Sequence, residues 1–395
     1  MQDVNFPNGF SAWGLACGIK KNGKPDLGVL VSEPAAQTFA AFTRNAVKAA
    51  PVLHGQKVSE SGRKVSHILV NSGNANACTG ERGYADVEAE VEAIRVAARP
   101  SDAVLVSSTG VIGEYLPMEK VRAGIARLFA PGAAEAGIPF VHAIMTTDTF
   151  AKRATRALDL DGRAVRLGGV AKGAGMIRPN MATMLAYLTT DIGLGPDYRP
   201  TFLAAVEKSF NSISVDGDMS TNDTCILLAN GASGAAYASL SPAGKDAFDA
   251  ALADLMQDLA KQVIRDGEGA TKLVTIDAVG ARSDEDAKRV CQAIANSPLV
   301  KTAFFGGDAN WGRVLAAAGY SGAELVPGKT SLDFCGVKVL ENGGRADYQE
   351  ADVAARMRAK DVSVRIDLGL GQGAWRYWTC DFSYDYVKIN ADYRT

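Results

Sequence analysis

The chain has 395 residues, of which 47% are apolar and 22% are charged, and its formal net charge at pH 7 is -2. These values are typical of a globular protein, and the length suits two hydrophobic cores or one large layered body. A charge so close to zero provides no basic field, so we expect neither nucleic acid nor a membrane surface as a partner. The chain also lacks a run of the ~20 apolar residues that a membrane helix needs, and its first ten residues lack the regions of a secretory signal. We therefore predict a cytoplasmic protein.

Cysteine and histidine usage argues against disulfide and metal chemistry. The six cysteines are scattered without a CxxC pair, so we expect free thiols. Only three histidines occur, and no HExxH or paired His/carboxylate spacing accompanies them, so we expect no metal site. His67 in VSHILV and His142 in FVHAIM lie in apolar runs, which predicts a core or sheet position for both.

The first half of the chain alternates short apolar runs with amphipathic segments. Three runs that end in small or polar residues predict buried strands, at residues 27–33, 67–73 and 103–110. Residues 85–99 carry apolar side chains at steps of three and four, which predicts a helix. A second helix is predicted over residues 117–129, since proline suits its first position.

The second half mixes the same kinds of element. Helices are predicted over residues 201–210, from Ser241 to about Val263, and over residues 284–295. Strands are predicted at residues 224–231, 273–280 and 362–369. The last of these alternates apolar and polar residues, which is typical of an antiparallel strand with one wet face. Because the elements show no regular βαβ rhythm, we predict a layered α+β body with sheets packed between helices.

The most informative segment reads KGAGMIRPNMATMLAYLTTD, from Lys172 to Asp191. A glycine-rich loop meets a proline turn and then an apolar strand, and Thr183 is expected to be the first residue of that strand. If the chain is cut just before Thr183, the freed α-amine lies beside the hydroxyl as a built-in base, and the threonine becomes a nucleophile. The alternative is an ordinary β-branched residue that begins a strand.

Two further segments group hydroxyls, backbone N–H groups and a carboxylate. SSTGVIG, residues 107–113, places Thr109 and Gly110 at a strand end, where they can form an oxyanion hole or an ordinary turn. MTTDT, residues 145–149, gathers hydroxyls around Asp148 in what is either a capped turn or a site.

Three more polar segments occur in the second half. SVDGDMSTNDT, residues 214–224, does not fit a calcium loop, so we interpret it as a structured polar loop beside the site. In RDGEGATK, Glu268 stands between two glycines, where it can bind a substrate ammonium or remain a solvated residue after a helix cap. GGDANWGR, residues 306–313, is a turn that lines a pocket or an interface, or a plain surface turn.

Taken together, these segments resemble the ornithine acetyltransferase family of arginine biosynthesis. The resemblance covers the chain from about residue 10 to the end. The matching stretches follow the family's order: NSGNANACTG, SSTGVIG, MTTDT, AKGAGMIRPNMATML, SVDGDMSTNDT, DGEGATK, FGGDANWGR and INADYRT. The segment at residues 369–383 departs from the family pattern but holds no expected site residue.

The resemblance implies a particular fold and maturation. The body would be a helix/sheet/sheet/helix layering of the self-processing N-terminal-nucleophile kind, with a smaller C-terminal α/β region. The precursor would cut itself between Ala182 and Thr183. An α chain of residues 1–182 and a β chain of residues 183–395 would then interleave in one body and assemble as a heterotetramer of two α and two β chains.

The resemblance also implies the chemistry. Thr183 would take the acetyl group of N-acetylornithine, with its own α-amine as base (pKa roughly 8), and ornithine would leave. Glutamate would then accept the acetyl group and become N-acetylglutamate, in ping-pong order. Thr109 and Gly110 match the family's oxyanion hole. The family's substrate contacts carry over to Thr146, Lys172, Thr183, Glu268, Asn390 and Thr395. No bound cofactor is implied, although acetyl-CoA is expected as a second acetyl donor in a bifunctional enzyme.

Two alternatives differ in class from this interpretation. A related self-cleaving aminopeptidase or amidohydrolase would release the acyl group to water, and Glu268 and the INADYRT ending argue against it. A binding protein without enzymatic activity would keep the fold, and an intact Ala182–Thr183 bond in the purified protein would favour it.

Overall fold

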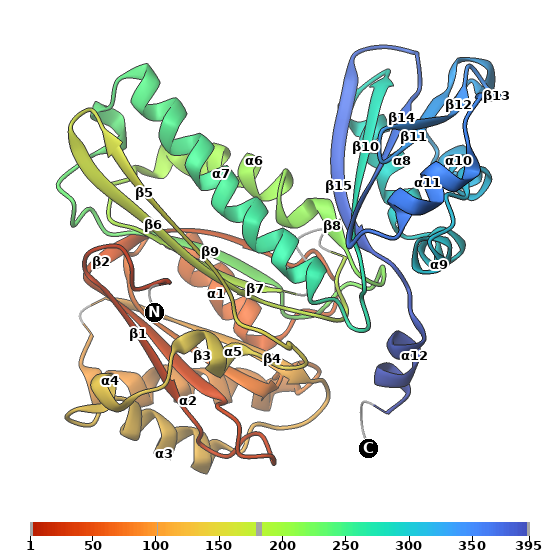
Figure 1. The fold of residues 1–395 in the computed structure, drawn as a ribbon. Coiled ribbons are helices and arrows are strands. Elements are labelled where there is room, and N and C mark those ends of the chain that lie inside the picture. Colours follow the sequence, from red (N-terminus) through yellow and green to blue (C-terminus); the bar gives the residue numbers. More distant parts are fainter. Residues whose placement is uncertain (1–2, 101, 179–183, 393–395) are drawn as a thin grey trace. The chain divides into compact units, whose positions relative to one another are not determined.

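The computed structural model describes residues 3–100, 102–178 and 184–392 (Figure 1). The chain divides into two compact units. Unit 1 comprises residues 1–211 and 218–260, and unit 2 comprises residues 212–217 and 261–395. Each unit has its own β-sheet.

The described residues of unit 1 form an eight-stranded sheet in the order β4-β3-β2-β9-β7-β6-β5, with β1 paired to β2. The strands are β1 (Phe10–Leu15), β2 (Leu27–Phe42), β3 (Val65–Asn74), β4 (Ala103–Val111), β5 (Lys152–Leu160), β6 (Arg163–Lys172), β7 (Leu185–Thr190) and β9 (Thr224–Ala229). The strands β7 and β9 follow residue 182 in the chain, yet they lie between β6 and β2, which precede it.

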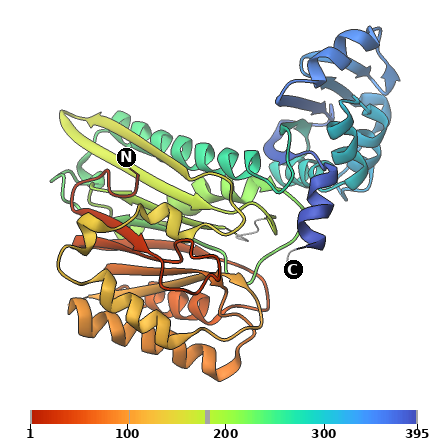
Figure 2. The ribbon, with the colours of Figure 1, turned by 60° about the horizontal axis from the view of Figure 1, so that its bottom comes forward.

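The long strand β2 carries the sheet from one layer to the other. Its first part pairs with β1 and β3, its last part pairs with β9, and the register shifts between Val31 and Ala36. The sheet can therefore fold over into two facing layers (Figures 1 and 2). Apolar side chains from both layers meet in one core, with Leu30, Val70, Tyr187 and Ile226 among them.

Helices cover the outer faces of the two layers in unit 1. Figure 2 shows α2 and α3 along the outer face of β1 to β4, and α7 lies across the face that carries β5 to β7. A second core fills the space between the first layer and its helices, with Val87, Ile94, Val104 and Val121 among its members. The helices are α1 (Ala50–Glu60), α2 (Gly80–Ala98), α3 (Met118–Leu128), α4 (Ala133–Ala136), α5 (Phe140–Ile144), α6 (Arg199–Glu207) and α7 (Pro242–Arg265).

Unit 2 contains a seven-stranded sheet in the order β13-β12-β11-β14-β10-β15-β8. Its strands are β8 (Ile213–Ser214), β10 (Leu273–Ala281), β11 (Ser331–Phe334), β12 (Val337–Glu341), β13 (Gly344–Arg345), β14 (Asp361–Asp367) and β15 (Gly373–Cys380). Its helices are α8 (Asp284–Ala295), α9 (Pro298–Gly306), α10 (Trp311–Gly319), α11 (Glu350–Met357) and α12 (Tyr384–Ala391). The predicted α+β class with sheets and helices in layers is confirmed.

Two details of the sequence interpretation need correction. The strand β14 alternates exposed and buried residues as expected, but it runs parallel to β10 and antiparallel only to β11. His67 is buried in β3, where its ring contacts the Ser66 hydroxyl at 2.8 Å, as predicted. His142 is instead exposed, because it lies on the outer face of the short helix α5.

Among the described residues, no helix is both long enough and apolar enough to cross a membrane.

Candidate active site

The predicted oxyanion residues lie at the end of β4, where that strand runs parallel to β3. Gly110 pairs with Gly73 in this register and adopts a φ of +135°. A Cβ atom at Gly110 would lie 2.3 Å from the carbonyl carbon of Gly73 and 2.5 Å from the backbone nitrogen of Asn74. Only glycine fits such a backbone approach. The strand end therefore holds the Thr109–Gly110 peptide close to β3.

Lys172 reaches the same place from the end of β6. Its side chain is buried, with 5% of its surface exposed, and its Nζ donates a hydrogen bond of 3.3 Å to Thr109 Oγ1. The structure thus brings together two predicted site residues that are 63 positions apart in the sequence. A cation beside a hydroxyl and a strand-end peptide is suited to hold an anionic group next to a carbonyl that is under attack.

Asp148 connects Thr146 to the Lys172 segment. Its Oδ2 accepts the backbone N–H of Thr146 at 2.8 Å, and its Oδ1 accepts the backbone N–H of Gly173 at 2.7 Å. Burial would raise the pKa of this carboxyl, but the ammonium groups of Lys172 and Lys152, together with the Gly173 N–H, lower that pKa to about 2. These neighbours therefore favour the ionised carboxylate form of Asp148.

The polar loop at residues 214–224 contributes Asn222, which the sequence interpretation noted only as part of a resemblance to a calcium loop that does not fit. Asn222 is buried, and its Nδ2 donates to the carbonyl oxygens of Ala75 at 2.6 Å and Ser108 at 2.9 Å. Because Ser108 precedes Thr109, the Asn222 amide ties the β4 end to the loop that follows β3. The available signal was a polar side chain beside a strand predicted to be buried. Burial raises the pKa of the adjacent Asp223 well above its usual range.

Two predicted substrate contacts meet within unit 2. Glu268 lies between α7 and β10 with 8% of its surface exposed, and its Oε2 accepts a 2.9 Å hydrogen bond from the Asn390 side-chain amide on α12. The same amide also donates to the Tyr386 carbonyl at 3.0 Å. Residues 122 positions apart therefore form one polar pair.

The remaining predicted site residues, Ala182, Thr183 and Thr395, lie outside the described residues. The strand predicted to begin at Thr183 is present as β7, whose described residues begin at Leu185 and are buried along the whole strand. Within the described part of the chain, no group of three or more His, Cys, Asp or Glu side chains is arranged to hold a metal ion.

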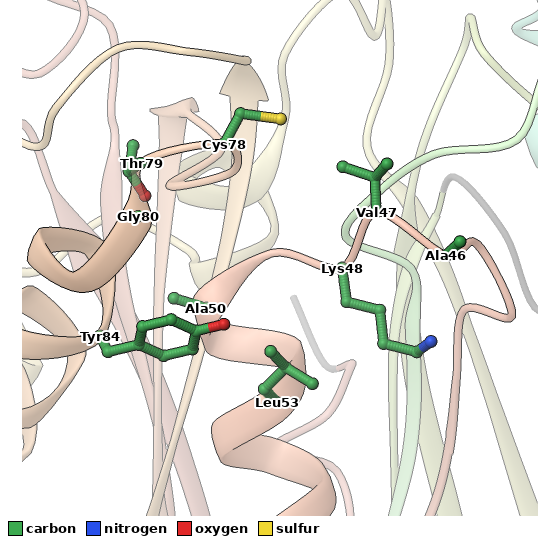
Figure 3. Close-up of a pocket in the computed structure, with 9 residues that line it drawn as sticks. All are labelled: Ala46, Val47, Lys48, Ala50, Leu53, Cys78, Thr79, Gly80 and Tyr84. Carbon is green, nitrogen blue, oxygen red and sulfur yellow. The ribbon is translucent and has the colours of Figure 1, made fainter.

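A separate pocket of about 360 Å³ opens in unit 1 beside the start of α2 (Figure 3). Lys48 and Tyr84 extend along it, and Cys78 points its sulfur across the opposite end. The lining consists of Ala46, Val47, Lys48, Ala50, Leu53, Cys78, Thr79, Gly80 and Tyr84. None of the predicted site residues is in this lining.

Comparison with known proteins decides the family. Residues 11–395 match the ArgJ family. The chain belongs to the ArgJ family. It is 48% identical over 391 residues to the arginine biosynthesis bifunctional protein ArgJ of Geobacter sulfurreducens, covering 98% of this chain and 99% of that protein. It is 45% identical to the mitochondrial bifunctional ArgJ protein of Schizosaccharomyces pombe, covering 99% of this chain and 93% of that protein.

A solved ArgJ structure is also similar. The crystal structure of the arginine biosynthesis bifunctional protein ArgJ from Bacillus halodurans is 38% identical, with a TM-score of 0.51, and the match covers 53% of this chain and 100% of that chain. The resemblance to the ornithine acetyltransferase family of arginine biosynthesis is therefore confirmed, and it covers residues 11–395 of this chain.

Proposed function

We propose that this ArgJ-family protein is an acetyltransferase of arginine biosynthesis that moves an acetyl group from N-acetylornithine to glutamate through acetyl-Thr183. The observation that carries the proposal is the contact of Lys172 with Thr109 beside Gly110. This contact places a buried cation next to the groups that would stabilise an acyl oxyanion. Membership of a family whose relatives are named arginine biosynthesis proteins supports the same pathway.

The nucleophile would be freed by self-cleavage between Ala182 and Thr183. The Thr183 hydroxyl attacks the Ala182 carbonyl, the peptide nitrogen leaves as the Thr183 amine, and water then opens the resulting ester. The products are an α chain of residues 1–182 and a β chain of residues 183–395, which we propose assemble as a heterotetramer. The solved Bacillus halodurans ArgJ chain supports the cleavage. Its full length matches only 53% of this chain, and the proposed β chain of residues 183–395 makes up a similar share.

In the cleaved enzyme, Thr183 would transfer the acetyl group in two steps. Its α-amine takes the hydroxyl proton as the oxygen attacks the acetyl carbonyl, and the Thr109 and Gly110 groups stabilise the oxyanion. The ammonium formed then gives its proton to the departing ornithine amine, which leaves acetyl-Thr183. Glutamate attacks this ester through its own amine, and N-acetylglutamate leaves as the threonine hydroxyl is restored. Such a sequence gives ping-pong kinetics.

The substrate contacts follow from charge. Lys172 would bind the substrate carboxylate, with Thr146 beside it, and Glu268 would bind the side-chain ammonium of ornithine. Asn390 orients Glu268 through their 2.9 Å hydrogen bond, and Thr395 completes the set in our proposal. A Glu268→Gln variant should therefore lose discrimination for ornithine, and full retention of that discrimination would contradict the assignment.

Acetyl-CoA is the proposed second acetyl donor, in keeping with the word bifunctional in the relatives' names. An assay with acetyl-CoA and glutamate, without N-acetylornithine, tests it directly, and absence of N-acetylglutamate would leave a monofunctional enzyme. We propose no bound cofactor, and we place the enzyme in the cytoplasm without nucleic-acid or membrane partners.

The deciding experiment is the mass of the denatured protein beside that of a Thr183→Ala variant. The wild type should give two fragments, of residues 1–182 and 183–395, and the variant one uncut chain. A single uncut wild-type chain would remove the α-amine base and refute the mechanism. Release of acetate from N-acetylornithine without need for glutamate would instead favour the related amidohydrolase.

A further inference from the structure

The geometry points to Asp148 as a positioning residue that fixes the Thr146 segment and the Lys172 segment in one arrangement, with Lys152 as its counter-ion. Both segments are substrate contacts under the function proposed above, on which this inference rests. Asp148 acts through these two segments, because its oxygens are occupied by protein donors.

One carboxylate joins the segment from Thr146 to Lys152 to the residue that follows β6. Oδ2 accepts the Thr146 N–H at 2.8 Å, while Oδ1 accepts the Gly173 N–H at 2.7 Å and the Lys152 ammonium at 2.6 Å. The side chains of Asp148 and Lys152 are fully buried, so water does not compete for these bonds. Charge-assisted hydrogen bonds in such surroundings are short and strong, and they hold backbone positions closely.

Lys20 fixes the other side of the same peptide. Its Nζ donates to the Met145 carbonyl at 2.6 Å and to the Pro25 carbonyl at 2.7 Å. The Met145 carbonyl and the Thr146 N–H belong to one planar peptide unit. That unit is therefore held at its oxygen by Lys20 and at its nitrogen by Asp148, which restricts the direction in which Thr146 points.

Lys152 lies four residues after Asp148 and forms the direct ion pair with it. Lys152 begins β5 and pairs with Ala171 on β6, the residue just before Lys172. Two lysines on adjacent strands thus lie near one carboxylate, and the charges of both act on it. Lys152 forms the direct ion pair with Asp148, and the Lys172 ammonium acts on the same carboxylate through its charge.

Stability alone does not account for this cluster. A buried ion pair gives little net stability compared with apolar side chains of similar volume, because both charges must be desolvated. The backbone bonds made by Asp148 instead link two segments that are 25 residues apart in the sequence. Fixing the relative position of two binding segments pre-organises the site, so the substrate does not have to order them when it binds.

The test compares Asp148→Asn with Lys152→Met and with the double variant. Asparagine keeps the shape but has one acceptor oxygen, so it cannot accept from both the Thr146 and the Gly173 N–H groups. We expect the dissociation constant for ornithine, measured by calorimetry, and the KM for N-acetylornithine to rise on the order of 10- to 100-fold, with a smaller change in kcat. Lys152→Met leaves both backbone bonds in place and should change ornithine binding by less than about threefold.

The double variant removes the risk that a buried lysine that has lost its carboxylate partner unfolds the protein. It should regain the melting temperature that Asp148→Asn loses, yet keep the weakened ornithine binding, which a purely stabilising role would not produce. Asp254→Asn is the matched control, because it changes an exposed carboxylate that pairs with Arg156 on β5 at 2.8 Å, and it should bind ornithine like the wild type.

Wild-type ornithine binding in the double variant would overturn the inference. So would equal weakening by Lys152→Met, which would assign the effect to the ion pair. The mass of the denatured wild type distinguishes failure of this inference from failure of the proposed function. If the wild type is uncut and transfers no acetyl group but binds ornithine, and Asp148→Asn weakens that binding, the proposed function fails while the positioning role stands.

Discussion

Glu90 provides a stability prediction that can be worked out from the structure. It lies on the inner face of α2 with none of its surface exposed, and neither carboxyl oxygen has a hydrogen-bond partner among the described residues. Burial, and to a lesser extent the nearby charge of Asp86, raises the pKa of Glu90 to about 8. Asp86, one turn earlier, is in turn close to Arg82, at 4.0 Å.

The direction in which the free energy of unfolding changes with pH follows from proton binding. The unfolded carboxyl has a pKa of 4.5, so between pH 4.5 and pH 8 the folded chain holds a proton that the unfolded chain has released. The free energy of unfolding must therefore fall as the pH rises through this window. Each pKa unit corresponds to 1.36 kcal/mol, so Glu90 should cost about 3 kcal/mol more at pH 8 than at pH 5.

Replacing Glu90 with leucine should remove that loss. We expect Glu90→Leu to be more stable than the wild type at pH 8, and its advantage should be about 3 kcal/mol smaller at pH 5. Urea unfolding of both proteins at the two pH values measures this difference. Glu88→Leu on the exposed face of the same helix is the control and should show no such pH dependence. An advantage of Glu90→Leu that is equal at pH 5 and pH 8 would refute the reasoning.

Three further substitutions test other parts of the chain. Gly110→Ala places a Cβ 2.3 Å from the backbone of β3. It should lower acetyl transfer, measured by ornithine release, by on the order of 100-fold. Gly113 also has a positive φ, but an added Cβ there would meet no atom within 4 Å, so Gly113→Ala should lower acetyl transfer much less. Arg265→Ala removes an exposed ion pair with Asp361 and should change the free energy of unfolding by less than about 1 kcal/mol in urea titrations. Burial lowers the pKa of Lys301, so wild-type stability should rise as the pH approaches 10.5, and Lys301→Met should flatten that rise in melting curves.

Local pattern predicted the elements well wherever one face is buried. The helix expected over residues 85–99 is α2, and its buried residues Val87, Val91 and Ile94 carry the periodicity that revealed it. The observed helix begins earlier, at Gly80, because its first turn is mostly exposed and so leaves no apolar pattern. His142 was misassigned for a related reason, since a one-turn helix is too short for its exposed position to show in the sequence.

Contacts between distant segments could not be predicted from local pattern. The Asp148 bond to Gly173 and the Asn222 bond to Ser108 depend on strand order and register, which one sequence does not encode locally. The family resemblance supplied Thr146 and Lys172 as substrate contacts but not Lys152, although Lys152 lies only four residues after Asp148. The carboxylate in MTTDT was visible in the sequence, whereas its bond to the distant Gly173 N–H was not.

The position of the proposed cleavage site explains how the two fragments could stay together in one folded body. The segment between Lys172 and Leu185 connects two antiparallel neighbours, and these residues pair directly at the end of the β6–β7 ladder. Cleavage between residues 182 and 183 would therefore break the connection between the two strands and leave every residue pair of β6 and β7 intact. β7 would also keep its parallel pairing with β9, and β9 its antiparallel pairing with β2. The two fragments would share one sheet and one buried core, so they should separate only when the protein is denatured.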